Sequence, residues 1–299
     1  MARAVLITNP AAARTTHQSV KTVSDVFRRA GWNFEVQATT GPGDARKIAA
    51  HAVMDSFDLV VVQGGDGTTM QAAASLVGTD VALGLVPGGT GNLLAGNLRI
   101  PRAVGRAAET LVRGRRRRID LGRMDRAHGA NYFSVACGAG LDAWVMNETR
   151  SEEKRRWGIG AYVATTLRVL PEFKSFSAAV TVDGVEYDAR AAMILVANCG
   201  EVIPPFLKLG HGISPWDGKL DVVVVRANDV WDGMRAVWHV LRDLPATEVS
   251  GTFIGYARGR TVKVETDSTQ PVELDGEAGG ATPFTASVVP EAISVVVPA

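Results

Sequence analysis

Short strand-like runs alternate with amphipathic stretches along the first third of the chain. Strands are predicted at residues 4–8, 33–38, 59–62 and 81–86, and the last two are continuous apolar runs bounded by turn residues, as in a buried parallel sheet. Helical spacing of apolar residues predicts helices at residues 20–30, 44–54, 68–77, 93–98 and 101–112. This alternation predicts an α/β domain with a parallel sheet and helices on both of its faces.

The pattern changes near residue 120 to many short strands separated by turn signals. Strands are predicted at residues 118–124, 132–137, 178–182, 185–187, 193–198, 220–225, 261–265, 272–274, 286–289 and 294–297. Such a series is typical of an antiparallel β-sandwich, here interrupted by predicted helices at 151–170 and 230–244. We therefore expect an α/β domain over residues 1–120 and a β-sandwich domain over 121–299. Whether the last strand returns to the first domain stays open.

A glycine-rich loop, GGDGT at residues 64–68, follows the third predicted strand and precedes a helix. Glycines permit close approach of an anion to the backbone, and the start of a helix leaves amide groups that favour phosphate. Asp66 has two interpretations at this stage. It is either part of a plain Asp-Gly turn or a carboxylate that meets a magnesium ion on nucleotide phosphates.

A second loop of the same design, PGGTGN at residues 87–92, follows the fourth predicted strand. Loops at the carboxyl ends of neighbouring parallel strands face one crevice, where ligands usually bind. Thr90 offers a hydroxyl, and Asn92 can cap the helix or hold a polar group of a ligand. Thr40 ends the second strand and faces the same crevice, although a turn threonine explains it equally well. Together the two loops indicate a nucleotide-binding cleft.

Composition narrows the class of protein. A formal net charge of +1 over 299 residues gives no reason to expect nucleic acid as a partner. Cys137 and Cys199 are far apart and the histidines show no metal spacing, which argues against a disulfide scaffold or a zinc site. No apolar stretch reaches transmembrane length, so we expect a cytoplasmic protein whose membrane contact, if any, is peripheral at the inner face. The arginine run at 113–118 is interpreted as a solvated helix end or linker, with anionic lipid as the alternative.

Acidic residues of the second domain are the remaining candidates for chemistry. Asp120 and Asp142 are flanked by residues expected to be buried, and a buried carboxylate needs a partner or a metal. The segments 214–218 and 275–277 (Asp-Gly-Glu) have turn composition, so a structural role is the default for both.

Six motifs occur in a fixed order along the chain, and together they resemble the diacylglycerol kinase catalytic-domain family, which includes bacterial lipid kinases, sphingosine kinases and ceramide kinases. They are GGDGT at 64–68, PGGTGN at 87–92, IDLG at 119–122, GAGLDA at 138–143, WDGKLDV at 216–222 and LDGE at 274–277. The resemblance implies an α/β nucleotide-binding domain followed by a β-sandwich, with the active site in the cleft between them.

The resemblance also implies a reaction, namely magnesium-dependent transfer of the γ-phosphoryl group of ATP to a lipid hydroxyl such as that of diacylglycerol. Asp66 and Asp120 would belong to the magnesium and phosphate network, and Glu277 would be the general base. A structural magnesium ion would be held by the Asp217 carboxylate and the backbone carbonyls of Ser214 and Lys219. The nucleotide contacts expected are Asn9, Arg14, Thr40, Gly64, Gly65, Asp66, Gly67, Thr68, Thr69, Met70, Gly89, Thr90 and Asn92.

One departure from the family pattern is Arg14, which stands after Asn9-Pro10 and three alanines where the family commonly has small polar residues, glycine and a lysine. A planar guanidinium is not interchangeable with an ammonium group, so nucleotide preference is affected. Two alternatives stay open, a NAD kinase-like enzyme, which shares GGDGT, and a catalytically silent nucleotide- or lipid-binding module. A homodimer is likewise an open alternative to a monomer.

Overall fold

The computed structural model describes residues 2–126, 129–140, 143, 175–203, 207–209, 212–226 and 254–299, which form two compact units. The first unit comprises the chain up to Ile119 together with Glu291–Ala299, and the second comprises Asp120–Pro290. The predicted helices at 151–170 and 230–244, and the candidate Asp142, lie outside the described residues.

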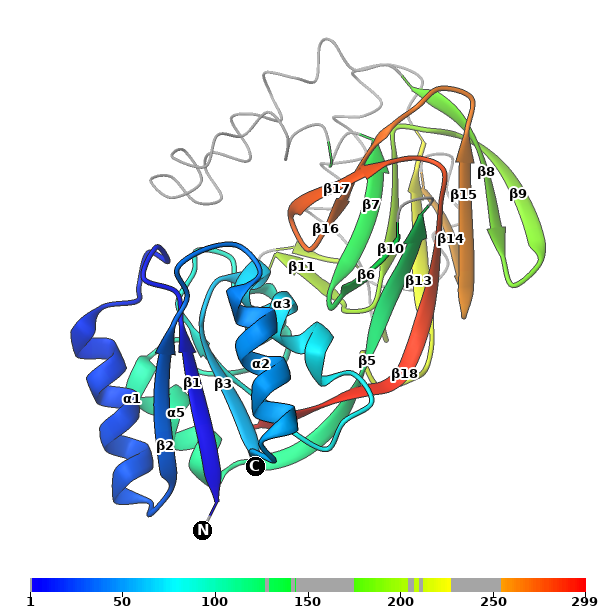
Figure 1. Cartoon of the computed structure of the whole chain (residues 1–299). Coiled ribbons are helices and arrows are strands. Elements are labelled where there is room, and N and C mark those ends of the chain that lie inside the picture. The colour runs from blue at the N-terminus through cyan, green and yellow to red at the C-terminus, as the bar shows by residue number, and fades with distance from the viewer. Residues whose placement is uncertain are drawn as a thin grey trace. The chain divides into compact units, whose positions relative to one another are not determined.

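A parallel sheet forms the centre of the first unit (Figure 1). Its strands are β1 (Arg3–Thr8), β2 (Asn33–Ala38), β3 (Leu59–Gly64) and β4 (Ala82–Pro87), in the order β2-β1-β3-β4. Every residue of β3 and β4 is buried, as their continuous apolar runs predicted. The end of β18 (Phe284–Val297) extends this sheet, because Ser294 and Val295 pair in parallel with β4. The last strand therefore does return to the first unit.

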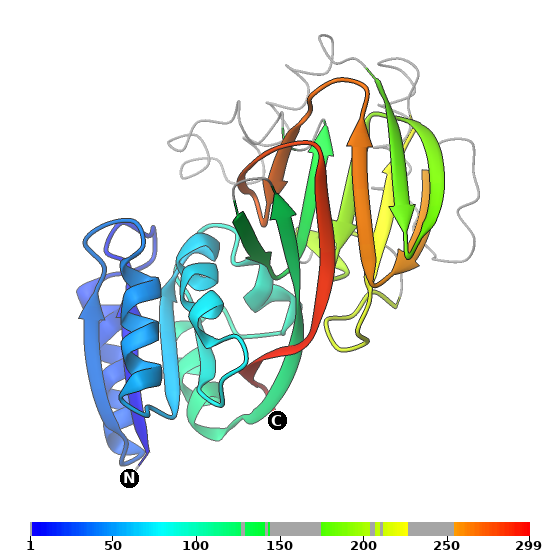
Figure 2. The same ribbon diagram turned by 45° about the vertical axis from the view of Figure 1, so that its right-hand side comes forward.

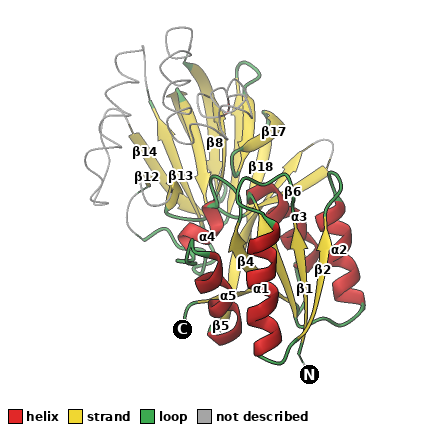
Figure 3. Cartoon of the chain, turned by 90° about the vertical axis from the view of Figure 1, so that its left-hand side faces the viewer, coloured by secondary structure: helices red, strands yellow, loops and turns green. Residues whose placement is uncertain are grey.

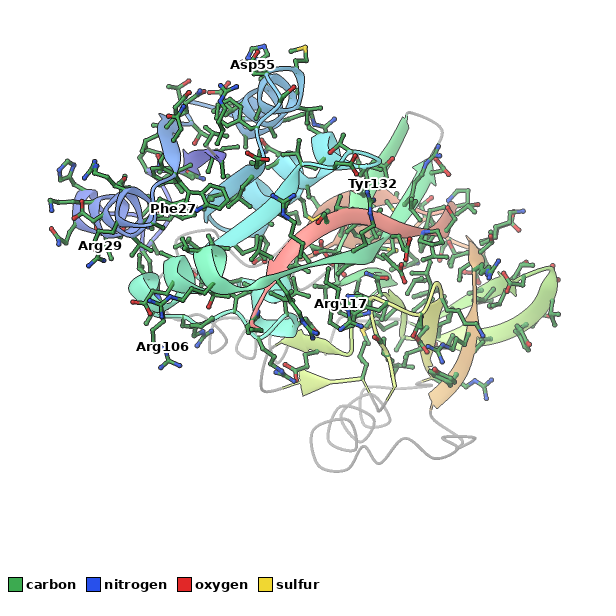
Figure 4. All side chains as sticks on the ribbon, turned by 90° about the horizontal axis from the view of Figure 1, so that it is seen from below. Phe27, Arg29, Asp55, Arg106, Arg117 and Tyr132 are labelled. Atoms are coloured by element: carbon green, nitrogen blue, oxygen red, sulfur yellow. The ribbon has the colours of Figure 1, made fainter. Side chains whose placement is uncertain are left out.

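Helices cover both faces of this sheet. They are α1 (His17–Arg29), α2 (Asp44–Met54), α3 (Asp66–Leu76), α4 (Leu93–Asn97) and α5 (Val104–Arg113). Helices α1 and α5 pack together, as do α2 and α3 (Figure 3). Viewed from below, Phe27 of α1 points toward the strands and Arg29 points away (Figure 4). Phe27 stacks on Phe34 of β2 with ring centroids 4.5 Å apart, which fixes α1 against the sheet.

Two local expectations in the first unit were wrong, the second only in part. Helix α1 begins at His17, ahead of the predicted residue 20, because Thr16 and Ser19 form a capping box in which each side chain bonds the other residue's amide. The arginine run at 113–118 starts at a helix end as expected, because Arg113 is the last residue of α5, but its remaining arginines form no linker, because they belong to β5 (Arg115–Arg126). Within that strand, Arg118 pairs with Asp80 at 3.0 Å.

The second unit is an antiparallel β-sandwich. One of its sheets has the order β14-β13-β10-β7-β16-β17, and the other contains β18, β15, β8 and β9, with β18 beside β15 (Figure 2). The strands are β6 (Gly129–Phe133), β7 (Ala136–Gly140), β8 (Phe176–Val182), β9 (Val185–Ala191), β10 (Met193–Ala197), β13 (Leu220–Val225), β14 (Ile254–Gly259), β15 (Thr261–Thr266), β16 (Pro271–Leu274) and β17 (Glu277–Ala281). Two further short strands, β11 (Glu201–Ile203) and β12 (Leu207–Lys208), pair with each other.

The core of the second unit lies between these sheets. Phe176, Ile194, Val222 and Phe284 belong to one buried cluster to which both sheets contribute. Burial of a large apolar side chain contributes about 1.5–3 kcal/mol, so the residues of this cluster stabilise the unit strongly. The predicted α/β plus β-sandwich fold is confirmed. The expected second domain, 121–299, differs from the compact unit at its carboxyl end, because residues 291–299 pack with the parallel sheet.

Among the described residues, no helix is long and apolar enough to cross a lipid bilayer.

Candidate functional site

The first candidate region is the carboxyl edge of the parallel sheet. Strands β1 and β3 are neighbours, yet the chain visits β2 on the far side of β1 before it returns to β3. Ligands of open α/β sheets bind outside the strand ends at such a reversal of strand order. Here the loops after β1 and β3 are tied together, since Asn9 Nδ2 donates to Thr68 Oγ1 at 2.9 Å and the Asn9 amide donates to Gln63 O at 3.0 Å.

The two glycine loops touch through their backbones. The Gly88 amide donates to the Gly64 carbonyl at 3.0 Å. A Cβ atom added at Gly89 would lie 2.6 Å from Gly65 Cα, and one added at Gly88 would lie 2.9 Å from Gly64 N. These positions need glycine because backbone atoms occupy the space that a side chain would take. The pairing of the two loops, predicted from their sequence order, is therefore a direct contact.

Asp66 fastens the first loop to the second. Its Oδ2 accepts from the Asn92 amide at 2.8 Å and its Oδ1 accepts from the Leu93 amide at 2.6 Å. Asp66 is the first residue of α3, and its carboxylate also meets the start of α4, so two helix N-termini lie beside its charge. These two amide donors offset part of the Asp66 charge, and the membership of Asp66 in a magnesium and phosphate network stays a prediction.

Asn92 shapes the second loop from within. Its backbone is left-handed, with φ of 51°, and its side chain exchanges two hydrogen bonds with Gly89: Oδ1 accepts from the amide at 2.9 Å and Nδ2 donates to the carbonyl at 2.7 Å. Asn92 stands at the N-cap position of α4, but its side chain makes no capping bond to that helix. The capping role considered for Asn92 is therefore wrong, because its side chain is buried and bonded to its own loop, whereas its contact with a ligand stays a prediction.

The start of α3 keeps hydrogen-bond donors that no side chain caps. Gly65 is the N-cap residue and makes no side-chain bond, and the first helical bond runs from the Thr69 amide to the Gly65 carbonyl at 3.0 Å. The amides of Gly67 and Thr68 precede that bond, at a helix start of the kind that favours anions. A small cavity beneath the loops is lined by Gly64, Asp66, Thr69, Pro87 and Asn92, among others.

Arg14 and Thr40 lie on the neighbouring loops. The Arg14 amide donates to the Gly88 carbonyl at 2.9 Å, while its side chain is exposed and has no ion-pair partner among the residues described. Thr40 is committed locally, because its hydroxyl and its amide both donate to Asp44 Oδ2, at 2.7 and 2.9 Å. These bonds, with the Thr40 hydroxyl contributing most, lower the pKa of Asp44. Gly67, Met70 and Thr90 lie on the same loops and the same helix start.

Asp120 belongs to the second unit, where it clamps the turn at residues 215–218. The Asp120 amide donates to the Pro215 carbonyl at 2.8 Å, and Oδ2 accepts from the Gly218 amide at 2.7 Å. Asn198 extends this network, since its Nδ2 donates to the carbonyls of Asp120 and Ser134 at 3.0 and 2.8 Å. The motifs IDLG and WDGKLDV are therefore joined by hydrogen bonds, and Asp120 is buried as the sequence predicted.

The same turn carries the residues expected to hold a structural magnesium ion. Asp217 Oδ1 accepts from the Lys219 amide at 3.0 Å, and Oδ2 forms an ion pair with the Arg258 guanidinium. Arg258 also approaches the buried Asp221 carboxylate, with Nε 3.4 Å from Oδ1. The Arg258 guanidinium therefore lies on one oxygen of the Asp217 carboxylate, and a divalent ion on that oxygen would have to displace it. The magnesium site expected at Ser214, Asp217 and Lys219 stays a prediction.

Tyr256 contacts the buried Asp221 carboxylate, and burial and this contact shift the pKa of both side chains. Burial raises the pKa of Asp221, and the Tyr256 hydroxyl, which donates to its Oδ1, opposes that rise. The pKa of Tyr256 is itself raised, first by burial and then by this bond. Within the described ranges, no group of three or more His, Cys, Asp or Glu side chains is arranged to hold a metal ion.

The LDGE motif forms a tight hairpin between β16 and β17. Asp275 and Gly276 have φ of 48° and 82°, the left-handed pair of a type I′ turn, and Leu274 pairs with Glu277 across it. Glu277 is exposed and has no hydrogen-bond or ion-pair partner in the described part of the chain. The turn predicted for this segment is confirmed, and it presents a free carboxylate on its second strand.

Asp275 is a residue that the sequence interpretation passed over as part of that turn. It is buried, and its carboxylate accepts from the amides of Ser134, Val135 and Ala136 at 2.7, 2.8 and 3.1 Å. Burial raises the pKa of Asp275, and the hydrogen bonds from these three residues partly offset that rise. Nothing in the local pattern marks these partners, because they lie about 140 residues away along the chain.

The structure thus brings the nucleotide candidates together in the first unit and the acidic candidates of the sandwich in the second. The nucleotide candidates of the first unit are joined by hydrogen bonds or by direct loop contact, namely Asn9, Arg14, the 64–70 segment, Gly89 and Asn92. Thr40 instead bonds to Asp44, its one side-chain partner among the described residues. Asn198 and Arg258 lie outside the motifs, and Asp275 lies within LDGE but was assigned only to its turn. Each acts through distant partners rather than through its neighbours in sequence.

Comparison with known proteins gives the family. The model described as "Diacylglycerol kinase catalytic domain" matches residues 3–124, and the one described as "YegS C-terminal NAD kinase beta sandwich-like domain" matches residues 135–297. The diacylglycerol kinase of Bacillus subtilis (strain 168) is 30% identical, over 95% of this chain and 92% of that protein. The diacylglycerol kinase of Mycobacterium tuberculosis (strain CDC 1551 / Oshkosh) is also 30% identical, over 85% and 82%.

A crystal structure of a diacylglycerol kinase from Bacillus anthracis str. Sterne has the same fold, with a TM-score of 0.77 at 20% identity over 99% of this chain and 96% of that one. The ordered motifs, the two glycine loops in contact and the two matching models agree. The chain belongs to the diacylglycerol kinase catalytic-domain family.

Proposed function

We propose that this protein is a lipid kinase, which transfers the γ-phosphoryl group of ATP to a lipid hydroxyl, with diacylglycerol as the first acceptor to test. The observation that carries the proposal is the backbone contact between two glycine loops at the carboxyl ends of β3 and β4, next to an uncapped helix terminus. The names of the relatives from B. subtilis and M. tuberculosis support the choice of acceptor.

We assign the phosphates of ATP to the amides at the start of α3, because a helix N-terminus without a side-chain cap attracts anions. The Arg14 backbone is bonded to the second glycine loop, and its guanidinium is exposed. The guanidinium can bind a phosphate through two parallel donors, where a lysine would supply a point charge. Asp66 acts here as a positioning residue that keeps the loops in register. The nucleotide is expected to arrive as its magnesium complex, in which the metal offsets the phosphate charge.

Glu277 is proposed as the general base. As the lipid oxygen attacks the γ-phosphorus, a new P–O bond forms and the bond from the γ-phosphorus to the β–γ bridging oxygen breaks, releasing ADP. The hydroxyl proton passes to the Glu277 carboxylate. This carboxylate is suited to the task because it is exposed and has no partner among the described residues. The second unit is proposed to receive the lipid, which requires peripheral contact with a membrane.

The test incubates the purified protein with γ-labelled ATP and five acceptors: diacylglycerol, ceramide, sphingosine, an isoprenol and NAD. We expect label on a lipid. Label on NAD alone would favour a NAD kinase-like enzyme. The family description that matches residues 135–297 also names the NAD kinase sandwich. ATP binding without transfer to any acceptor would favour a silent binding module.

A variant pair tests the base. Glu277→Gln is expected to lower kcat by about 10²–10⁴-fold, the usual contribution of a general base, with ATP affinity unchanged. Glu186→Gln is the control, because Glu186 is also exposed in a hairpin strand that follows an Asp-Gly turn. Equal activity of Glu277→Gln and the wild type would remove Glu277 from this role.

A further inference from the structure

The Asp275 carboxylate accepts four hydrogen bonds from outside its own hairpin, which a type I′ turn does not require. Oδ2 accepts from the amide and the hydroxyl of Ser134, at 2.7 and 2.8 Å, and Oδ1 accepts from the amides of Val135 and Ala136, at 2.8 and 3.1 Å. The Asp275 amide donates back to the Ala136 carbonyl at 2.9 Å. One buried carboxylate thus binds three consecutive amides of the segment that leads into β7, which lies beside β16 (Figure 1).

These bonds hold the residue that precedes the proposed base by two positions. The turn is further fixed because the Gly276 amide donates to Glu273 Oε2 at 2.7 Å. Glu277 follows directly and has no bond of its own to another side chain in the described part of the chain. Its location is therefore set by the backbone of the turn, and that backbone is set by Asp275 and Glu273.

A second hairpin of the same chain provides a comparison. Asp183 and Gly184 connect β8 and β9 with φ of 48° and 89°, nearly the same pair of angles. Asp183 also accepts backbone amides, those of Arg260 and Thr261, at 2.8–3.0 Å. This carboxylate is exposed, and an apolar residue, Val185, follows the turn. An Asp-Gly turn can therefore be anchored to a neighbouring segment without burial of the charge.

Four hydrogen bonds offset the cost of burying the Asp275 carboxylate, and together they fix the β16–β17 turn on residues 134–136. We propose that Asp275 is a positioning residue for the phosphoryl-transfer reaction, which holds the β16–β17 turn on the amides of residues 134–136 so that the Glu277 carboxylate stays in one place. This inference rests on the proposed function, in which Glu277 is the base. It assigns to Asp275 an effect on the rate of the chemical step that a plain turn residue lacks.

The first experiment compares Asp275→Asn with Asp183→Asn, using a short-chain diacylglycerol in mixed micelles and MgATP. Asparagine presents one acceptor oxygen and an NH2 group, so part of the amide set at 134–136 loses its partner. A misplacement of about 1 Å can lower a rate about 10²-fold, so we expect kcat of Asp275→Asn to fall 10- to 100-fold with the KM for ATP within about twofold of wild type. Asp183→Asn should keep the wild-type kcat. Equal kcat values for Asp275→Asn and the wild type would overturn the inference.

A double-mutant cycle separates positioning from general loss of structure. If Asp275 acts through Glu277, Asp275→Asn should reduce the residual rate of Glu277→Gln by less than about twofold. A full 10- to 100-fold further loss would show that Asp275 affects the enzyme by another route and would refute the proposal. If Glu277→Gln alone keeps full activity, the proposed function fails first; if Glu277→Gln is inactive while Asp275→Asn is fully active, only this inference fails.

A milder variant covers the case in which Asp275→Asn does not fold. Ser134→Ala removes the hydroxyl bond to Oδ2 and keeps the three amide bonds. We expect a three- to tenfold lower kcat, unchanged KM for ATP and a thermal midpoint close to that of Asp183→Asn. A wild-type kcat in Ser134→Ala, with Asp275→Asn unfolded, would assign Asp275 to folding and overturn the proposal.

Discussion

A methyl group at Gly89 tests whether the two glycine loops are in contact. The Cβ of Gly89→Ala would lie 2.6 Å from Gly65 Cα, about 1 Å inside the ~3.5–4.0 Å optimum for carbon atoms. The atom it meets is backbone, so no rotamer change relieves the overlap. Gly89 does not adopt positive φ, hence the expected loss comes from this contact and not from backbone strain.

The magnitude follows from two opposing effects. Overpacking of a close contact costs about 1–3 kcal/mol, while replacing glycine by alanine at a compatible φ stabilises by about 0.4–1 kcal/mol through the unfolded chain. The overlap dominates at Gly89, so we expect a net loss near 1–2 kcal/mol. For a protein of this size each kcal/mol lowers Tm by about 2–4 °C, which gives a fall of roughly 2–8 °C by calorimetry or thermal denaturation.

Two neighbouring glycines supply matched controls. At Gly65 the nearest atom to an added Cβ is Gly89 Cα at 3.8 Å, an ordinary contact, and at Gly41 nothing lies within 4 Å. Gly41→Ala should therefore keep or slightly raise Tm. Gly65→Ala should lower Tm by less than Gly89→Ala, because it creates no overlap and only exchanges glycine for a poorer N-cap residue, and it should weaken ATP binding if phosphate approaches that loop. An unchanged Tm in Gly89→Ala, with ATP affinity equal to wild type, would refute the loop contact.

Two further predictions concern charge. The pKa of Asp44 is lowered, so its bonds to Thr40 stabilise the fold above about pH 3.8, and this stabilisation is lost as pH falls through the lower pKa of the folded state. Carboxyl NMR should give a titration midpoint for Asp44 below 3.8, and the midpoint should move upward in Thr40→Val. An ordinary midpoint in the wild type would count against the bond. Arg258→Met removes the cation between Asp217 and Asp221. Because the Arg258 side chain is 33% exposed, the expected loss in free energy of unfolding lies between the ~0.2–1 kcal/mol of an exposed ion pair and the ~3–5 kcal/mol of a buried one. Mg²⁺ should raise the Tm of this variant, because the Asp217 carboxylate is then open to a metal. A chelator should leave the wild-type Tm unchanged. A fall in wild-type Tm with chelator would show that a metal is bound in spite of Arg258.

The sequence predicts most of the fold because the signals involved are local. Apolar runs that end in glycine locate β3 and β4, and Asp-Gly locates the hairpins at residues 183 and 275. The start of α1 was missed because a capping box is a side-chain exchange between Thr16 and Ser19, which apolar spacing does not register.

The candidate site was predictable in position and less so in role. The order of strands brings the two glycine loops together, but hydrogen bonds from Asp66 to residues 92 and 93 depend on a loop-to-loop distance that no motif specifies. The same limit applies to Arg258, whose pairing with Asp217 and Asp221 joins residues about 40 positions apart. Motifs therefore identify which residues meet, and the folded chain decides which of their atoms remain available to a ligand.

The path of β18 has a consequence for how the protein is made. Its residues 294 and 295 complete the parallel sheet beside β4, more than 200 positions after that strand, and Ile293, Val295 and Val297 are buried there. During synthesis on the ribosome, the parallel sheet of the first unit lacks this strand until residues 294 and 295 have emerged. A fragment ending near residue 119 would leave the β4 edge bare and prone to pairing with other chains. Nucleotide-binding assays on such a fragment should include residues 291–299, supplied as a linked segment.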